Sequence, residues 1–155
     1  MVIAMMGILT TTVSFVYNLH FKSWNEVYAR SVIRANLSQA LELMADRLLE
    51  AQSIDTFKEN SITFTADLGG GSNTYRLYLY NTNDPGAPPY TQSTYDLLSA
   101  QGTVSDGEGV ILSRDIARPL GAPFIMNGKV ITINLTAQRG AEQVTMSTSV
   151  RPRNL

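Results

Sequence analysis

The chain has 155 residues and a mass of 17.0 kDa, which is room for one ordinary domain and a long helix. Its formal net charge of −1 argues against nucleic-acid binding, and the absence of cysteine excludes disulfide bonds and thiolate metal sites. The only histidine, His20, has no second histidine to join it in a metal site, and the chain has no GxSxG motif, so we expect neither an enzyme nor a cofactor.

An uncharged segment opens the chain and covers residues 1–17. A membrane-spanning helix needs about 20 apolar residues, and residues 1–21 provide that length if Asn18 and His20 lie at the membrane interface. The segment has neither a basic beginning nor a small-residue cleavage site, which argues against a secretory signal peptide. We therefore predict a helix that lies in a membrane or in the core of a filament.

This prediction divides the chain into residues 1–24, a hydrophobic transmembrane or filament-core helix, and residues 25–155, a soluble domain. Tyr17, Phe21 and Trp24 would form an aromatic belt where the two parts meet. The apolar side chains expected to contact a membrane or a bundle of helices are Val2, Ile3, Met5, Met6, Ile8, Leu9, Val13, Phe15 and Val16.

Helical character continues beyond the apolar segment, since neither glycine nor proline occurs between Gly7 and Gln52. Apolar residues recur there at intervals of four, four, three and four, which places them on one side of a helix. The residues of this stripe are Ile33, Leu37, Leu41, Met44 and Leu48. We expect one continuous helix to about Gln52, with the stripe packed against a sheet.

The remaining sequence has the alternating patterns and turn residues of a β-sheet. We expect strands at residues 61–67, 74–80, 109–113, 124–126, 129–136 and 143–150, whereas residues 95–98 fit either a short helix or a strand. Asn127-Gly128 is a strong hairpin signal, and residues 81–89 are too rich in proline to continue a strand. The predicted fold class is α+β: a long N-terminal helix, first apolar and then amphipathic, packed on one face of an antiparallel sheet in meander order.

Candidate binding residues are few. Asp106 and Glu108 could supply oxygen ligands to a calcium ion, but two carboxylates are fewer than a dedicated calcium loop provides, and a plain glycine-rich turn is the favoured interpretation. Five tyrosines could form an exposed patch for a partner, although half-buried strands also use tyrosine routinely, and we favour the structural role. These are Tyr75, Tyr78, Tyr80, Tyr90 and Tyr95.

The run from Val2 to Leu9, VIAMMGIL, resembles the N-terminal helix of type IV pilins and type II secretion pseudopilins, and the long helix to Gln52 resembles the spine of that family. The strand VITINLTAQ, followed by QVTMSTSV and Arg-Pro-Arg-Asn, is similar to the ending of minor subunits of the W and J types. The family's processing site, N-methylated first residue and assembly glutamate do not occur in these 155 residues. The resemblance thus implies that Met1 falls several residues inside the family helix.

The resemblance implies a structural minor pilin or pseudopilin that acts in filament assembly. Its expected partners are other pilin or pseudopilin subunits, through the N-terminal helix, and the bacterial inner membrane. The resemblance also implies a domain outside the cytoplasm and later a periplasmic or extracellular filament, whereas a count of basic residues after the apolar segment would place the domain in the cytoplasm. The alternative is a membrane-tethered extracytoplasmic binding or sensor domain.

Overall fold

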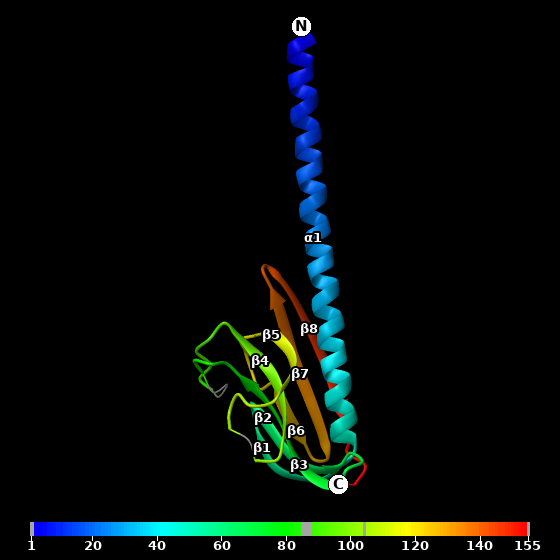
Figure 1. Cartoon of the computed structure of the whole chain (residues 1–155), viewed down its shortest axis with the longest axis vertical. Helices are drawn as coiled ribbons and strands as arrows, with labels where there is room; N and C mark the ends of the chain where they lie inside the picture. Colours follow the sequence, from blue (N-terminus) through cyan, green and yellow to red (C-terminus); the bar gives the residue numbers. More distant parts are fainter. Residues whose placement is uncertain (1, 85–87, 104, 155) are drawn as a thin grey trace.

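The computed structural model is dominated by one helix, α1, which runs without interruption over Val2–Leu49 and is about 72 Å long. The structure describes residues 2–84, 88–103 and 105–154, and for residues 2–5, 8 and 9 the backbone alone. Figure 1 shows that a sheet packs against the C-terminal part of α1, whereas the N-terminal part extends beyond it. The expected α+β arrangement, a long helix on an antiparallel sheet, is confirmed.

Eight strands follow the helix: β1 (Ala51–Lys58), β2 (Ser61–Asp67), β3 (Ser72–Tyr80), β4 (Thr94–Gln101), β5 (Val110–Ala117), β6 (Phe124–Asn127), β7 (Val130–Arg139) and β8 (Glu142–Val150). β2 has the predicted bounds, and five others coincide with predicted strands to within a few residues. The ambiguous segment at residues 95–98 is a strand, part of β4.

The prediction that the helix reaches Gln52 was wrong by three residues, because Ala51 and Gln52 already belong to β1. This strand was not predicted. It lies at the edge of the sheet and pairs only with β2, with two register irregularities, and its exposed positions outnumber its buried ones. A strand of this kind carries little of the alternation by which strands are recognised.

The sheet is antiparallel, and its order is β1-β2-β3-β4-β5-β7-β6, with β8 paired to the other side of β7. The predicted meander order therefore holds from β1 to β5, but the next neighbour of β5 in the sheet is β7 and not β6. β7 pairs with β6 near its beginning, with β5 at the single pair Ile116–Ala137, and with β8 along its whole length. Gly128 and Gly140, with φ of 61° and 63°, make the tight turns that lead into β7 and out of it.

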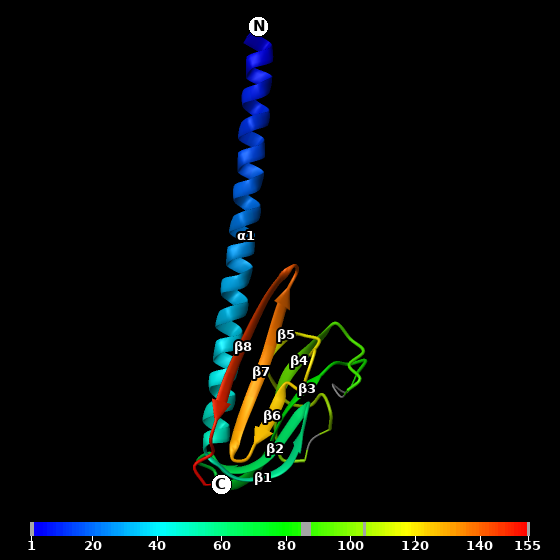
Figure 2. The same ribbon diagram turned by 180° about the vertical axis from the view of Figure 1, so that it is seen from behind.

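The hydrophobic core lies between α1 and the inner face of the curled sheet. Figure 2 shows from behind how the C-terminal part of α1 lies along that sheet. Alternation along β7 sets the inner face: Ile131, Ile133 and Leu135 are buried, while Thr132 and Asn134 face outward. The chain end returns to the helix, where the Arg153 amide donates a hydrogen bond of 3.0 Å to the Leu49 carbonyl. That bond satisfies one of the free carbonyls at the helix C-terminus.

A smaller apolar cluster of Tyr78, Leu98 and Ala100 lies on the opposite face of the sheet. It is closed by the turn after β4, since the Tyr78 hydroxyl donates to the Glu108 carbonyl at 2.8 Å. The Arg76 guanidinium lies 4.4 Å from the centre of the Tyr78 ring and donates to the Asp106 carboxylate at 2.6 Å. The sheet is thus covered on both faces at β3 and β4.

Candidate functional site

The projecting half of α1 is the most unusual surface of this protein. The described part of α1 up to Tyr28 leaves large apolar side chains exposed around the helix, and no other segment that the structure describes covers them. The members of this surface are Met6, Val13, Phe15, Val16, Tyr17, Leu19, Phe21, Trp24, Val27 and Tyr28. Exposed apolar surface on this scale is typical of sites that contact another protein or a membrane.

The predicted membrane or bundle residues fall on this half of the helix. Met6, Val13, Phe15 and Val16 are all more than half exposed. The side chains of Val2, Ile3, Met5, Ile8 and Leu9 lie outside the described part, although their backbone is helical. Within the described residues, no helix combines the length and apolarity that crossing a membrane requires.

The second half of α1 is different, because one side of it is buried. The five residues of the predicted stripe are between 0% and 6% exposed and join the main core: Ile33, Leu37, Leu41, Met44 and Leu48. The change from exposure to burial therefore occurs within one unbroken helix, between Tyr28 and Ile33.

Aromatic and charged residues occupy opposite sides of the projecting half near the domain. Lys22, Glu26 and Arg30 follow one another at intervals of four, on the side of the helix that continues into the buried stripe. The position of Arg30 confirms that the charged side faces the domain, because its Nε lies 4.0 Å from the Glu142 carboxylate at the start of β8. Sequence reasoning named an aromatic belt but missed that it points away from the domain; the helical spacing alone contains that signal.

Threonine hydroxyls near the beginning of the helix do not disturb its apolar surface. Thr10 Oγ1 donates to the Met6 carbonyl at 2.8 Å, and Thr11 Oγ1 donates to the Gly7 carbonyl at 2.6 Å. Each hydroxyl is satisfied within its own helix, so it can lie against an apolar neighbour at little cost.

The two calcium candidates serve a structural purpose. The Asp106 carboxylate pairs with Arg76, and the Glu108 carboxylate accepts a hydrogen bond of 3.3 Å from the Ser105 amide. In the part of the chain that the structure describes, no three His, Asp or Glu side chains gather where they could hold a metal ion. Of the five tyrosines, Tyr80 alone is not buried, so no aromatic patch forms on the sheet.

A polar cluster joins two residues that precede β4, Asp84 and Thr91, to Tyr95 in that strand. The Asp84 carboxylate accepts hydrogen bonds from the Thr91 amide, the Thr91 hydroxyl and the Tyr95 hydroxyl, at 2.7, 2.6 and 2.6 Å. Burial raises the pKa of Tyr95, and it raises the pKa of the neighbouring Tyr90 to about 12. Both phenols are therefore neutral at physiological pH, and the hydrogen bonds of the cluster connect Asp84 and Thr91 to β4.

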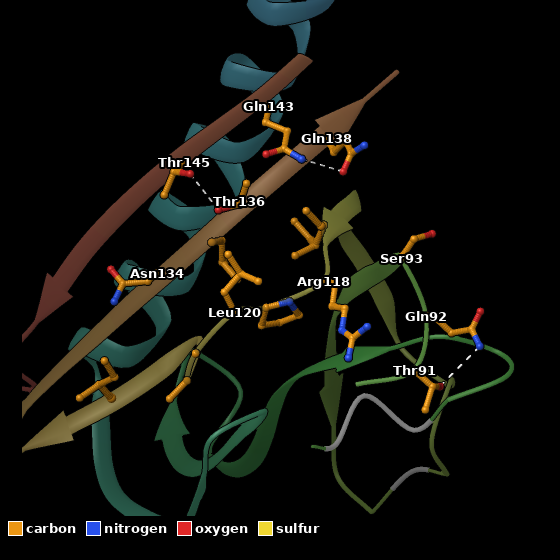
Figure 3. A pocket seen from close by; sticks show the side chains of 17 residues that line it. Thr91, Gln92, Ser93, Arg118, Leu120, Asn134, Thr136, Gln138, Gln143 and Thr145 are labelled. Atoms are coloured by element: carbon orange, nitrogen blue, oxygen red, sulfur yellow. Dashed lines mark hydrogen bonds between the residues drawn. The ribbon is translucent and has the colours of Figure 1, made fainter. Parts of the chain in front are cut away.

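A groove of about 800 Å³ opens where β5 and β7 separate. Figure 3 shows Asn134, Thr136 and Gln138 of β7 along one wall, with Arg118 and Leu120 on the segment that follows β5. Of the described residues that line the groove, Arg118 alone is charged. Sequence reasoning missed this groove because it depends on the departure from meander order.

Comparison with models of protein families, with curated proteins and with solved structures finds no match to this chain.

Proposed function

We propose that this chain is a structural subunit of the pilin type, a minor pilin or pseudopilin, which assembles with other subunits through the projecting half of α1. The observation that carries the proposal is the division of one continuous helix into a half that packs on its own sheet and a half whose described large apolar side chains are exposed. The resemblance of residues 2–9 to the pilin helix points to the same role.

Burial of these side chains supplies the driving force. Burying a large apolar side chain contributes about 1.5–3 kcal/mol, and ten such side chains are exposed on the described part of the projecting half. The domain cannot fold back to cover them, because α1 is continuous across the boundary. A bundle of like helices offers an apolar surface of the same shape, and Thr10 and Thr11 allow close approach between helices.

This proposal also sets the place of the protein. Before assembly the subunit would be held at the bacterial inner membrane with its domain outside the cytoplasm. After assembly it would belong to a type IV pilus or a type II secretion pseudopilus, with the helices inside and the sheets outside.

A single charge in the apolar helix tests the proposal. Val13→Arg places a cation on the apolar surface, where an unpaired charge costs several kcal/mol in a bundle. Ser23→Arg is the matched control, because Ser23 is exposed between charged residues on the same half. We expect sheared filaments to contain Ser23→Arg at the wild-type level and to lack Val13→Arg.

The groove beside β7 supports a second candidate, a membrane-tethered binding or sensor domain, because its volume is sufficient for a small ligand. If Val13→Arg assembles as wild type does, α1 does not act through helix contacts, and the tethered domain replaces the filament subunit.

A further inference from the structure

A heptad pattern runs along α1 across the boundary between its two halves. Tyr17, Phe21, Trp24 and Tyr28 are separated by four, three and four residues. The same alternation continues without a break through Ser31, Ala35, Ser38 and Glu42. Alternating steps of three and four place all eight residues on a single seam, as in a coiled coil. We call these eight residues the heptad seam.

The heptad seam lies on the side of α1 that faces away from the sheet. At 3.6 residues per turn, it is about half a turn around the helix from the buried stripe of Ile33 to Leu48, which lies on the side of α1 that contacts β7 and β8. All eight residues of the seam are exposed. The domain of the same copy therefore leaves the whole seam free for a neighbour.

The two halves of the heptad seam differ in size. The first half consists of four aromatic side chains that are 58–70% exposed, and two of them, Tyr17 and Phe21, stack with ring centres 6.3 Å apart. In the second half, Ser31, Ala35 and Ser38 are small, and Glu42 ends the seam with a carboxylate. Each residue of the second half follows an aromatic residue by 14 positions, which is two heptads.

We propose that the aromatic half of the seam in one copy docks, in parallel, on the small half of the seam in a second copy that is displaced along the axis by two heptads, about 21 Å. This inference rests on the proposed function and names the neighbour and the register of the contact. Phe21 then packs over Ala35, and Trp24 packs over Ser38. Large residues thereby meet small ones, as close packing requires.

The apolar surface available on this side of the helix is close to that of a standard protein interface. An aromatic side chain buries about 150–250 Å² when it is fully covered, and the four in the seam are more than half exposed. Together with Met6 and Val13 on the same side of the helix, they approach the roughly 800 Å² per partner of a standard interface.

Two copies could also pair their heptad seams in parallel without a stagger, or antiparallel. Particular side chains disfavour both of these arrangements. An unstaggered parallel pair sets Glu42 against the Glu42 of the second copy, where like charges repel, and sets Trp24 against Trp24. The stagger instead brings the Tyr28 hydroxyl, a donor, to the Glu42 carboxylate. An antiparallel pair also matches large with small residues, but it sets the apolar Val13 beside the exposed carboxylate of Asp46.

Disulfide cross-linking distinguishes the three arrangements, because the chain has no cysteine of its own. Two full-length copies, one lengthened by a tag, are expressed together, each with one cysteine, and are oxidised in intact cells. Tyr17→Cys is paired in turn with Ser31→Cys for the staggered contact, with Tyr17→Cys for the unstaggered one, and with Glu42→Cys for the antiparallel one. Glu26→Cys with Ser31→Cys is the control, because Glu26 lies on the opposite side of the helix.

We expect the Tyr17–Ser31 pair to cross-link at least fivefold more than the other three pairs. A dominant Tyr17–Tyr17 product overturns the stagger and leaves assembly through α1 intact. A dominant Tyr17–Glu42 product overturns both the stagger and a filament with parallel helices. If no pair exceeds the control while Val13→Arg still blocks assembly, the heptad seam is not the contact and the proposed function stands.

Discussion

Two neighbouring tyrosines allow the hydrogen bonding of the buried cluster to be measured by removing a single oxygen atom. Tyr90 and Tyr95 are both buried, and their rings meet edge to face with centres 5.5 Å apart. The Tyr95 hydroxyl donates to the Asp84 carboxylate at 2.6 Å and accepts from the Gln92 amide at 3.0 Å. The Tyr90 hydroxyl is buried without a hydrogen-bond partner among the described residues.

The same substitution should therefore have opposite effects at the two positions. Tyr95→Phe removes one of the hydrogen bonds that the buried Asp84 carboxylate accepts and leaves the Gln92 amide unpaired. Hydrogen bonds to charged groups contribute about 1.5–3 kcal/mol, so we expect a loss of about 2–3 kcal/mol in the free energy of unfolding. Tyr90→Phe removes a hydroxyl that is desolvated without compensation, so stability should stay unchanged or rise by up to about 1 kcal/mol.

Urea unfolding at pH 7, followed by circular dichroism, measures both variants against wild type. At about 2–4 °C per kcal/mol for a chain of this size, Tyr95→Phe should also lower Tm by roughly 5–10 °C. The double variant completes a double-mutant cycle: the two rings are in contact, so the deviation of its effect from the sum of the two single effects measures the coupling between the two tyrosines, about 0.5–3 kcal/mol for residues in contact. An equal loss in both single variants would refute the assignment of hydrogen bonds in this cluster.

Four further substitutions test the packing and the electrostatics of the domain. Leu41→Asp buries a carboxylate in the core and should cost several kcal/mol, enough to unfold the domain, whereas the exposed Glu42→Ala should stay within about 0.5 kcal/mol of wild type in thermal unfolding. Burial raises the pKa of Asp96 above 3.8, so the native state binds this proton more tightly than the unfolded chain, and stability falls as pH rises through that raised pKa. Asp96→Asn should remove that slope in unfolding measured from pH 3.5 to 7, and an unchanged slope would exclude Asp96 as its source. Gly107→Ala should cost about 2 kcal/mol or more, because φ there is 89° and the added Cβ would lie 2.6 Å from the Tyr80 ring; a neutral result would contradict that turn geometry.

Where a pattern is set by neighbours along the chain, the sequence was sufficient to predict it. The absence of glycine and proline between Gly7 and Gln52 predicted one unbroken helix, because helix propagation depends on local residues. The alternation over residues 129–136 predicted the strand β7, because successive residues of a strand point to opposite sides. Asn127-Gly128 predicted the hairpin between β6 and β7 for the same local reason.

Contacts between distant segments were decided only by the tertiary structure. β1 exists because β2 offers it a partner, and its own residues alternate too weakly to be recognised. β5 pairs with β7 rather than with β6, which follows it in the sequence. This departure from meander order opens the groove at Arg118. The heptad seam could be read from spacing alone, but its freedom depends on which side of α1 the sheet occupies. The sequence therefore determined the helix, with its apolar first half and its amphipathic second half. Tertiary packing, which joins residues far apart in the chain, decided which surfaces of that helix stay exposed.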